Sequence, residues 1–295
     1  MKTLTRKQIL GYTAFSAAAG LLLAIVRAVV SMVYLEPGVE MYAHGTPLPA
    51  IMHGIILLCG IAVCTSAFRP LCSNSAAKEL SPASQFTLFA SMFCGFLLLA
   101  YDLYLIYDVA SAGWDAIGPL IGRPPSGTVT MASAVFTLCL MIFAVPAAIY
   151  FLKAAQGVIK PSHPFFATMT VVWFVLFALH AYFDAAIAFN SPTKVLRILT
   201  VLTFAIYAIH ETRRTLDIPM PRIYFPSAFL AIFLGLTHAL SDAVLLGSGK
   251  IILQEGYLGI AVELAYVLYI LSRVLYLGTT KPTAAVCEAQ SAPQQ

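Results

Sequence analysis

Charged residues are scarce in this sequence. Lysine and arginine number 17 and aspartate and glutamate 13 among 295 residues, so 10% of the chain is charged, while 60% is apolar. A soluble domain carries roughly 25% charged residues, and this chain has too few to coat a surface that faces water. The composition therefore excludes an ordinary soluble domain.

The sequence also lacks the short motifs of several functional classes. It contains no GxxxxGK[ST] phosphate loop, no HExxH and no GxSxG, and its six cysteines form no CxxC pair. No run of lysine and arginine alternates with aromatic residues. These absences argue against ATP-driven transport by this chain alone, most familiar hydrolases, zinc-ribbon or dithiol chemistry, and nucleic-acid binding.

Apolar residues instead form long blocks, and a membrane-spanning helix needs about 20 of them to cross roughly 30 Å of hydrocarbon. The sequence predicts an all-α polytopic membrane bundle, with residues 1–279 as a single transmembrane domain and the polar residues 280–295 as a disordered cytoplasmic tail. Eight spans are predicted, at 9–34, 49–68, 84–109, 128–153, 164–189, 195–214, 224–246 and 255–277.

The distribution of positive charge between the predicted loops sets the orientation. Cytoplasmic loops of membrane proteins carry an excess of lysine and arginine, which predicts a cell-membrane protein with both termini in the cytoplasm. The inner segments then hold Lys2, Arg6, Lys7, Arg69, Lys78, Lys153, Lys160, Arg213, Arg214, Arg222 and Lys281. The outer segments hold Arg123, Lys194 and Lys250. We interpret one inner group as a topology anchor: His210, Glu211, Arg213 and Arg214.

Ionisable residues inside the apolar blocks are the candidates for function, because a charge at the centre of a span costs about 2.5 kcal/mol or more. All of them are predicted to lie in the outer half of the bilayer, which indicates a polar chamber that opens to the outside. They are Arg27, His53, Asp102, His180, Asp184, His238, Asp242 and Glu263.

Two of the spans repeat one pattern, in which a histidine is followed four residues later by an aspartate. The pairs are His180 with Asp184 and His238 with Asp242, and each pair shares one helix face. The constant offset suggests helical hairpins repeated in the same orientation, as occurs in transporters. If the two helices face each other, the four side chains converge, and Glu263 adds a fifth group.

Three interpretations of these pairs stay open. Each aspartate could orient its own histidine in a structural contact, or the group could bind a proton or cation. Alternatively, His180, Asp184, His238 and Asp242 could ligate a divalent metal ion or a haem, because facing helices with paired ligands build metal sites in bundles.

The charge count of the expected chamber bears on its ligand. Asp102, Asp184, Asp242 and Glu263 outnumber Arg27, even with Arg197 at the rim. A net negative chamber favours a cation, an amine or a proton over an anion. Arg27 and Asp102 are expected either to tune this charge or to neutralise each other.

The sequence thus predicts a small-solute or cation transporter, or a ligand-binding membrane protein, whose partners are the lipid bilayer and the small solute or cation. One alternative is a membrane-embedded metalloenzyme with the same histidines and aspartates as ligands. Another is a sensor or an accessory subunit of a membrane complex. An enzyme is the less favoured class.

Overall fold

Eight long helices make up most of the computed structural model, which describes residues 6–36, 40–66, 84–112, 130–156, 163–184, 188, 190–216, 221–251, 253 and 256–279. All eight are long and apolar enough to cross a membrane, as the sequence predicts. They are α1 (Arg6–Tyr34), α2 (Pro47–Ser66), α3 (Gln85–Ala112), α4 (Met131–Ala155), α5 (His163–Phe183), α6 (Pro192–Thr215), α7 (Pro221–Gly247) and α8 (Gly256–Thr279). The expected tail, 280–295, lies outside the described residues.

The largest difference from the predicted boundaries concerns the fifth span. The apolar run after Asp184 predicts a helix to residue 189, but α5 ends at Phe183. The chain then reaches Ser191, which precedes α6, and Pro192 occupies the first turn of that helix. Proline is favoured there because the first helical N–H has no intrahelical partner.

The outer surface of the bundle is apolar, whereas the exposed face of a helix in a soluble protein is polar. On α1, the exposed fractions of Leu22, Ile25 and Val33 are 62%, 64% and 67%. Arg27 lies on the opposite, buried face of the same helix and is 0% exposed. Apolar side chains turned outward and a charge turned inward are what a helix needs when lipid surrounds the bundle.

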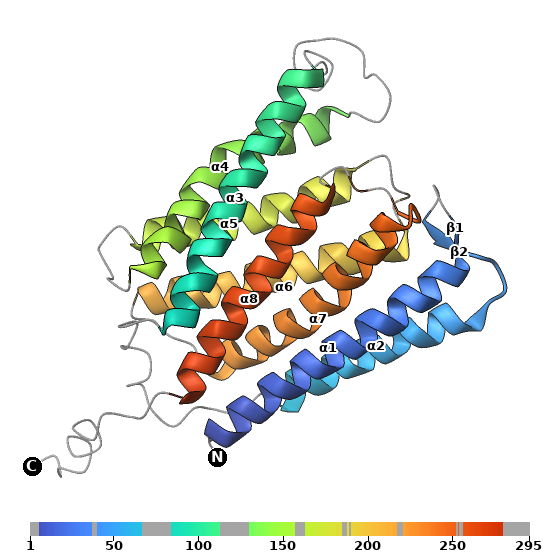
Figure 1. Cartoon of the computed structure of the whole chain (residues 1–295), viewed down its shortest axis with the longest axis horizontal. Coiled ribbons are helices and arrows are strands. Elements are labelled where there is room, and N and C mark those ends of the chain that lie inside the picture. Colours follow the sequence, from blue (N-terminus) through green and yellow to red (C-terminus); the bar gives the residue numbers. More distant parts are fainter. Residues whose placement is uncertain are drawn as a thin grey trace, which may run out of the picture.

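The centre of the bundle is formed by α6, α7 and α8 (Figure 1). In α7 and in α8, 67% of the apolar stretch is buried, compared with 28% in α2. Helix α1 packs against α7 and is followed by α2 on the same side, whereas α3 and α4 pack together beyond α5 and α8. Any side chain on the inner faces of α6, α7 and α8 is therefore enclosed by other helices.

Close contact between α7 and its neighbours depends on two glycines. A Cβ atom at Gly20 of α1 would lie 2.9 Å from the Phe233 carbonyl oxygen on α7. At Gly235, a Cβ atom would lie 2.3 Å from Val267 Cγ2 on α8 and 2.9 Å from Phe204 Cζ on α6. The helices approach this closely because neither position carries a side chain.

A short hairpin lies between the end of α1 and the start of α2, at one end of the bundle, which we call the hairpin end (Figure 1). Its strands, β1 (Leu35–Glu36) and β2 (Met41–Tyr42), pair antiparallel with Leu35 opposite Tyr42. The Tyr42 hydroxyl lies 2.8 Å from Ser31 Oγ on α1. This contact places the hairpin beside the inner face of α1, because Ser31 is only 1% exposed. Burial raises the pKa of Tyr42, and the nearby Arg27 guanidinium opposes part of that shift.

The first turns of α1 and the last turn of α8 meet at the opposite end. A Cβ atom at Gly278 would lie 3.0 Å from Leu10 Cδ2. The described chain therefore begins and ends on one side of the bundle, as an even number of spans requires.

Candidate functional site

The site begins with a buried ion pair between α1 and α7. Arg27 Nη1 donates hydrogen bonds to Asp242 Oδ1 and to Ser241 Oγ, and the side chains of Arg27 and Asp242 are both 0% exposed. The pair forms because the buried face of α1 packs along α7. Removal of either partner of a buried ion pair is strongly destabilising, because the remaining charge is left uncompensated and away from water.

The imidazole of His238 lies between two carboxylates. Its Nδ1 atom is 3.3 Å from Asp242 Oδ2, one turn further along α7, and its Nε2 atom is 3.3 Å from Glu263 Oε2 on α8. The first contact follows from the four-residue spacing seen in the sequence. The second requires that α7 and α8 pack side by side.

Arg197 on α6 completes the arrangement. Its Nε atom lies 3.4 Å from Glu263 Oε1, and its guanidinium lies over the Phe177 ring, 5.1 Å from the centroid. Arg27, Arg197, His238, Asp242 and Glu263 thus form one connected group, which we call the histidine network. It joins α1, α6, α7 and α8, and each of its side chains is at most 4% exposed.

The charges of the histidine network balance. Two guanidiniums face two carboxylates, each arginine with its own acid, and His238 is neutral in this count. The expectation of a net negative chamber counted four acids, whereas Asp102 and Asp184 are not among these five residues, so the network carries no net negative charge. The expected partner of Arg27 also differs, because this arginine forms its ion pair with Asp242 rather than with Asp102.

His180 of α5, and Asp184 just after the end of that helix, lie in different surroundings. His180 Nε2 is 3.2 Å from Thr137 Oγ1 on α4. The backbone carbonyl of Asp184 accepts a hydrogen bond of 2.6 Å from Lys194 Nζ. The two sequence patterns are therefore not equivalent. His180 of α5 contacts the preceding helix, α4, whereas His238 of α7 contacts the following helix, α8.

The expected four-residue metal site is not assembled in the described part of the chain. There, no group of three or more histidine, cysteine, aspartate or glutamate side chains is arranged to hold a metal ion. The reason is the packing order, since α6 packs against both α5 and α7 and contributes Arg197. Within the network, arginines occupy the places around Asp242 and Glu263 where a cation would bind.

Asp102 also lies apart from the network. It is on α3, 6% exposed, and its Oδ1 atom makes no hydrogen bond. Of the eight candidates, the contacts described above join four, namely Arg27, His238, Asp242 and Glu263.

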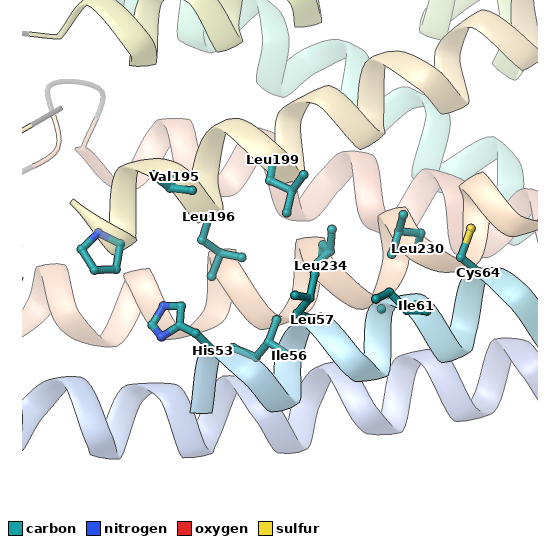
Figure 2. Close-up of a pocket in the computed structure, with 12 residues that line it drawn as sticks. His53, Ile56, Leu57, Ile61, Cys64, Val195, Leu196, Leu199, Leu230 and Leu234 are labelled. Carbon is teal, nitrogen blue, oxygen red and sulfur yellow. The ribbon is translucent and has the colours of Figure 1, made fainter. Parts of the chain in front are cut away.

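A groove of about 540 Å³ between α2, α6 and α7 is lined almost wholly by apolar side chains. Figure 2 shows Leu57 and Ile61 of α2 facing Leu199 of α6 and Leu230 of α7 across it. His53 also lines it, and its Nδ1 atom is 2.9 Å from the Pro49 carbonyl oxygen, within its own helix. This groove is an apolar surface and differs from the polar chamber that the sequence predicts.

No protein-family model, no curated protein and no solved structure matches this chain.

A second buried group lies toward the end of the bundle opposite the hairpin. Glu211 Oε1 accepts hydrogen bonds from the Tyr207 hydroxyl at 2.6 Å and the Tyr224 hydroxyl at 2.5 Å. Arg214 Nη1 and Arg273 Nε lie 3.8 and 3.6 Å from the same oxygen. We call these five residues, from α6, α7 and α8, the arginine–tyrosine cluster.

Sequence reasoning missed the significance of this cluster. It assigned Glu211 and Arg214 to a topology anchor at the inner end of the sixth helix, but these side chains are only 2% and 5% exposed. It did not select Arg273, which is 3% exposed. The signal was available, because an arginine inside an apolar block is as costly as a carboxylate.

Proposed function

We propose that this multi-pass membrane protein is a transporter that couples the movement of a small solute or cation to the protonation of His238. The observation that carries the proposal is the position of the imidazole, 3.3 Å from carboxylates on two different helices. A proton on the ring would be stabilised by Asp242 and by Glu263, and histidine is the side chain that exchanges protons most readily near neutral pH.

Protonation would change the charge of the histidine network from zero to +1. That change strengthens the attraction of His238 for Asp242 and Glu263, and so links α7 to α8 at this level. The same carboxylates hold Arg27 and Arg197, so the protonation state of one ring bears on the contacts of four helices. This is the kind of two-state element that transport requires.

In the proposed orientation the hairpin end faces outward and both termini lie in the cytoplasm of the cell. The network is enclosed, with side chains at most 4% exposed, as expected for a conformation closed to both sides. Access from the outside would then require the hairpin, which places Tyr42 near Arg27, to move away from the ends of α1 and α7.

Proton flux into liposomes tests the proposal when a mixture of small solutes and inorganic cations is supplied, because a coupled transporter moves protons only together with its solute. Purified protein is reconstituted with a pH-sensitive dye inside, and a potassium gradient with valinomycin sets the membrane potential. We expect His238→Gln to reduce protein-dependent flux at least about tenfold, the scale of one charge-assisted contact.

His163→Gln serves as the matched control, because His163 is also a buried histidine, 4% exposed, but lies in the first turn of α5. Flux in this variant should equal that of the unaltered protein. Equal flux in the His238→Gln variant, at equal insertion, would remove the proposal.

The balanced charge of the network favours a second candidate function, in which the network only joins four helices of an accessory subunit. This candidate predicts no protein-dependent proton flux in the unaltered protein, and copurification of a fixed partner.

A further inference from the structure

The arginine–tyrosine cluster has an excess of positive charge. It contains two guanidiniums, Arg214 and Arg273, and one carboxylate, Glu211. In the described chain no second carboxylate forms an ion pair with either arginine. Arginine stays protonated in proteins, and an unbalanced buried charge is costly. The histidine network, with two arginines and two acids, has no such excess.

The hydrogen-bond donors of these arginines are largely unused. Nη1 and Nη2 of Arg214, and Nε and Nη2 of Arg273, are buried and make no hydrogen bond. Glu211 Oε1 lies 3.6 Å from Arg273 and 3.8 Å from Arg214, beyond hydrogen-bonding distance. That oxygen instead accepts hydrogen bonds from Tyr207 and Tyr224.

The tyrosines hold the surroundings of the two arginines in place. The Arg214 guanidinium lies over the Tyr224 ring, 4.8 Å from the centroid, and a guanidinium packed on an aromatic ring can still donate through its N–H groups. The Tyr207 and Tyr224 hydroxyls are 2.9 Å apart. Both arginines lie within 3.8 Å of one atom, Glu211 Oε1, so their unused donors are near each other.

We propose that Arg214 and Arg273 together bind a small oxyanion, of the carboxylate or phosphate class. A planar guanidinium binds such anions through two parallel N–H bonds, and one bound monovalent anion would balance the cluster. The anion would enter from the end of the bundle opposite the hairpin, because Arg214 lies in the last turn of α6 and Tyr224 near the start of α7. This site is separate from the histidine network and does not depend on its proposed function.

The test measures thermal unfolding of the purified protein in lipid-free micelles, titrated with inorganic phosphate or with acetate at constant ionic strength. We expect a saturable rise in the unfolding temperature with at least one of the two. Arg273→Met and Arg214→Met should weaken the apparent affinity about tenfold or more, the scale of a lost charge-assisted bond.

Arg213→Met is the matched control. It removes the same charge from the same turn of α6, but Arg213 is more exposed than Arg214 and is not part of the cluster. It should leave the affinity within about twofold, since charges at the surface contribute little. An equal loss in Arg213→Met, or no saturable effect of either anion on the unaltered protein, would overturn the proposal.

Glu211→Gln keeps the test decisive if the arginine variants fail to fold. The glutamine retains the shape and the tyrosine contacts of Glu211 but removes a negative charge that competes with the anion. We expect tighter binding of phosphate or acetate in this variant, and weaker binding would count against the site.

A phosphate could also belong to a lipid headgroup. Nanodiscs of phosphatidylcholine alone, compared with nanodiscs that contain phosphatidylglycerol, separate the two sources. If the anionic lipid raises the unfolding temperature and Arg273→Met abolishes that rise, the site takes a headgroup. If only the dissolved anions act, it takes a free oxyanion, and if none acts, the proposal is wrong.

Discussion

His238 Nε2 on α7 lies 3.3 Å from Glu263 Oε2 on α8, and the same carboxylate is 3.4 Å from Arg197 on α6 through its other oxygen. One acid thus connects a neutral ring and a permanent cation on different helices. Whatever changes the charge of the ring also changes how strongly the acid holds α6, and this relationship connects chemistry to helix packing.

The Arg27–Asp242 pair should contribute strongly to stability only as a pair. Arg27→Met leaves the Asp242 carboxylate buried without its cation, and we expect a loss of about 3–5 kcal/mol in the free energy of unfolding. The double variant Arg27→Met with Asp242→Leu should recover most of that loss. Unfolding in mixed micelles gives the four values of the cycle, and additive losses would contradict the buried pairing.

The two aspartates that share a sequence pattern should behave differently. Asp242→Asn removes a carboxylate next to His238, so it should reduce proton flux about tenfold or more in the liposome assay. Asp184→Asn should change the flux less than about twofold, because Asp184 lies beside Lys194 rather than in the histidine network. Equal effects of the two substitutions would instead support the converging site that the sequence predicts.

Gly235 should tolerate no side chain. An added Cβ atom would lie 2.3 Å from Val267 Cγ2, so we expect Gly235→Ala to destabilise the protein by about 1–3 kcal/mol, the usual cost of overpacking. Gly11→Ala is the control, because nothing lies within 4 Å of a Cβ atom at that position of α1. Thermal unfolding measures both, and a neutral Gly235→Ala would show that the three helices are less tightly packed than described.

The orientation can be tested with single cysteines placed in a cysteine-free background. His44→Cys lies in the exposed turn after β2, and Thr279→Cys at the exposed end of α8. A membrane-impermeant maleimide added to intact cells should label the first and not the second. The reverse pattern would show that the proposed orientation is inverted.

The sequence predicts the helices well because their length and apolarity follow directly from the thickness of the membrane. It also predicts that Arg27, His238, Asp242 and Glu263 lie at a similar level. It does not predict which helices are neighbours. Their lateral order determines that His180 contacts Thr137 on α4. Hydropathy carries no information on lateral packing order, which depends on close contacts such as those at Gly20 and Gly235.

Arg197 illustrates the same limit. Its place near the start of the sixth apolar block suggests a water-facing rim, yet it is 4% exposed. The structure encloses it because its guanidinium contacts Phe177 of α5 and Glu263 of α8. The depth of a residue along a helix can be estimated from the sequence. Which neighbouring helix its side chain faces can be known only from how the helices pack.

The tight contact at Gly235 has a mechanical consequence. It lies on α7 between His238 and Tyr224, and it faces Phe204 and Val267 on the two adjoining helices. Because α6, α7 and α8 are in close contact at the level of Gly235, a tilt of one helix relative to the others would pivot at that level. In the proposed transporter, spreading of the helix ends on one side of the membrane would draw together the ends on the other side, and an aqueous path would open to one compartment at a time.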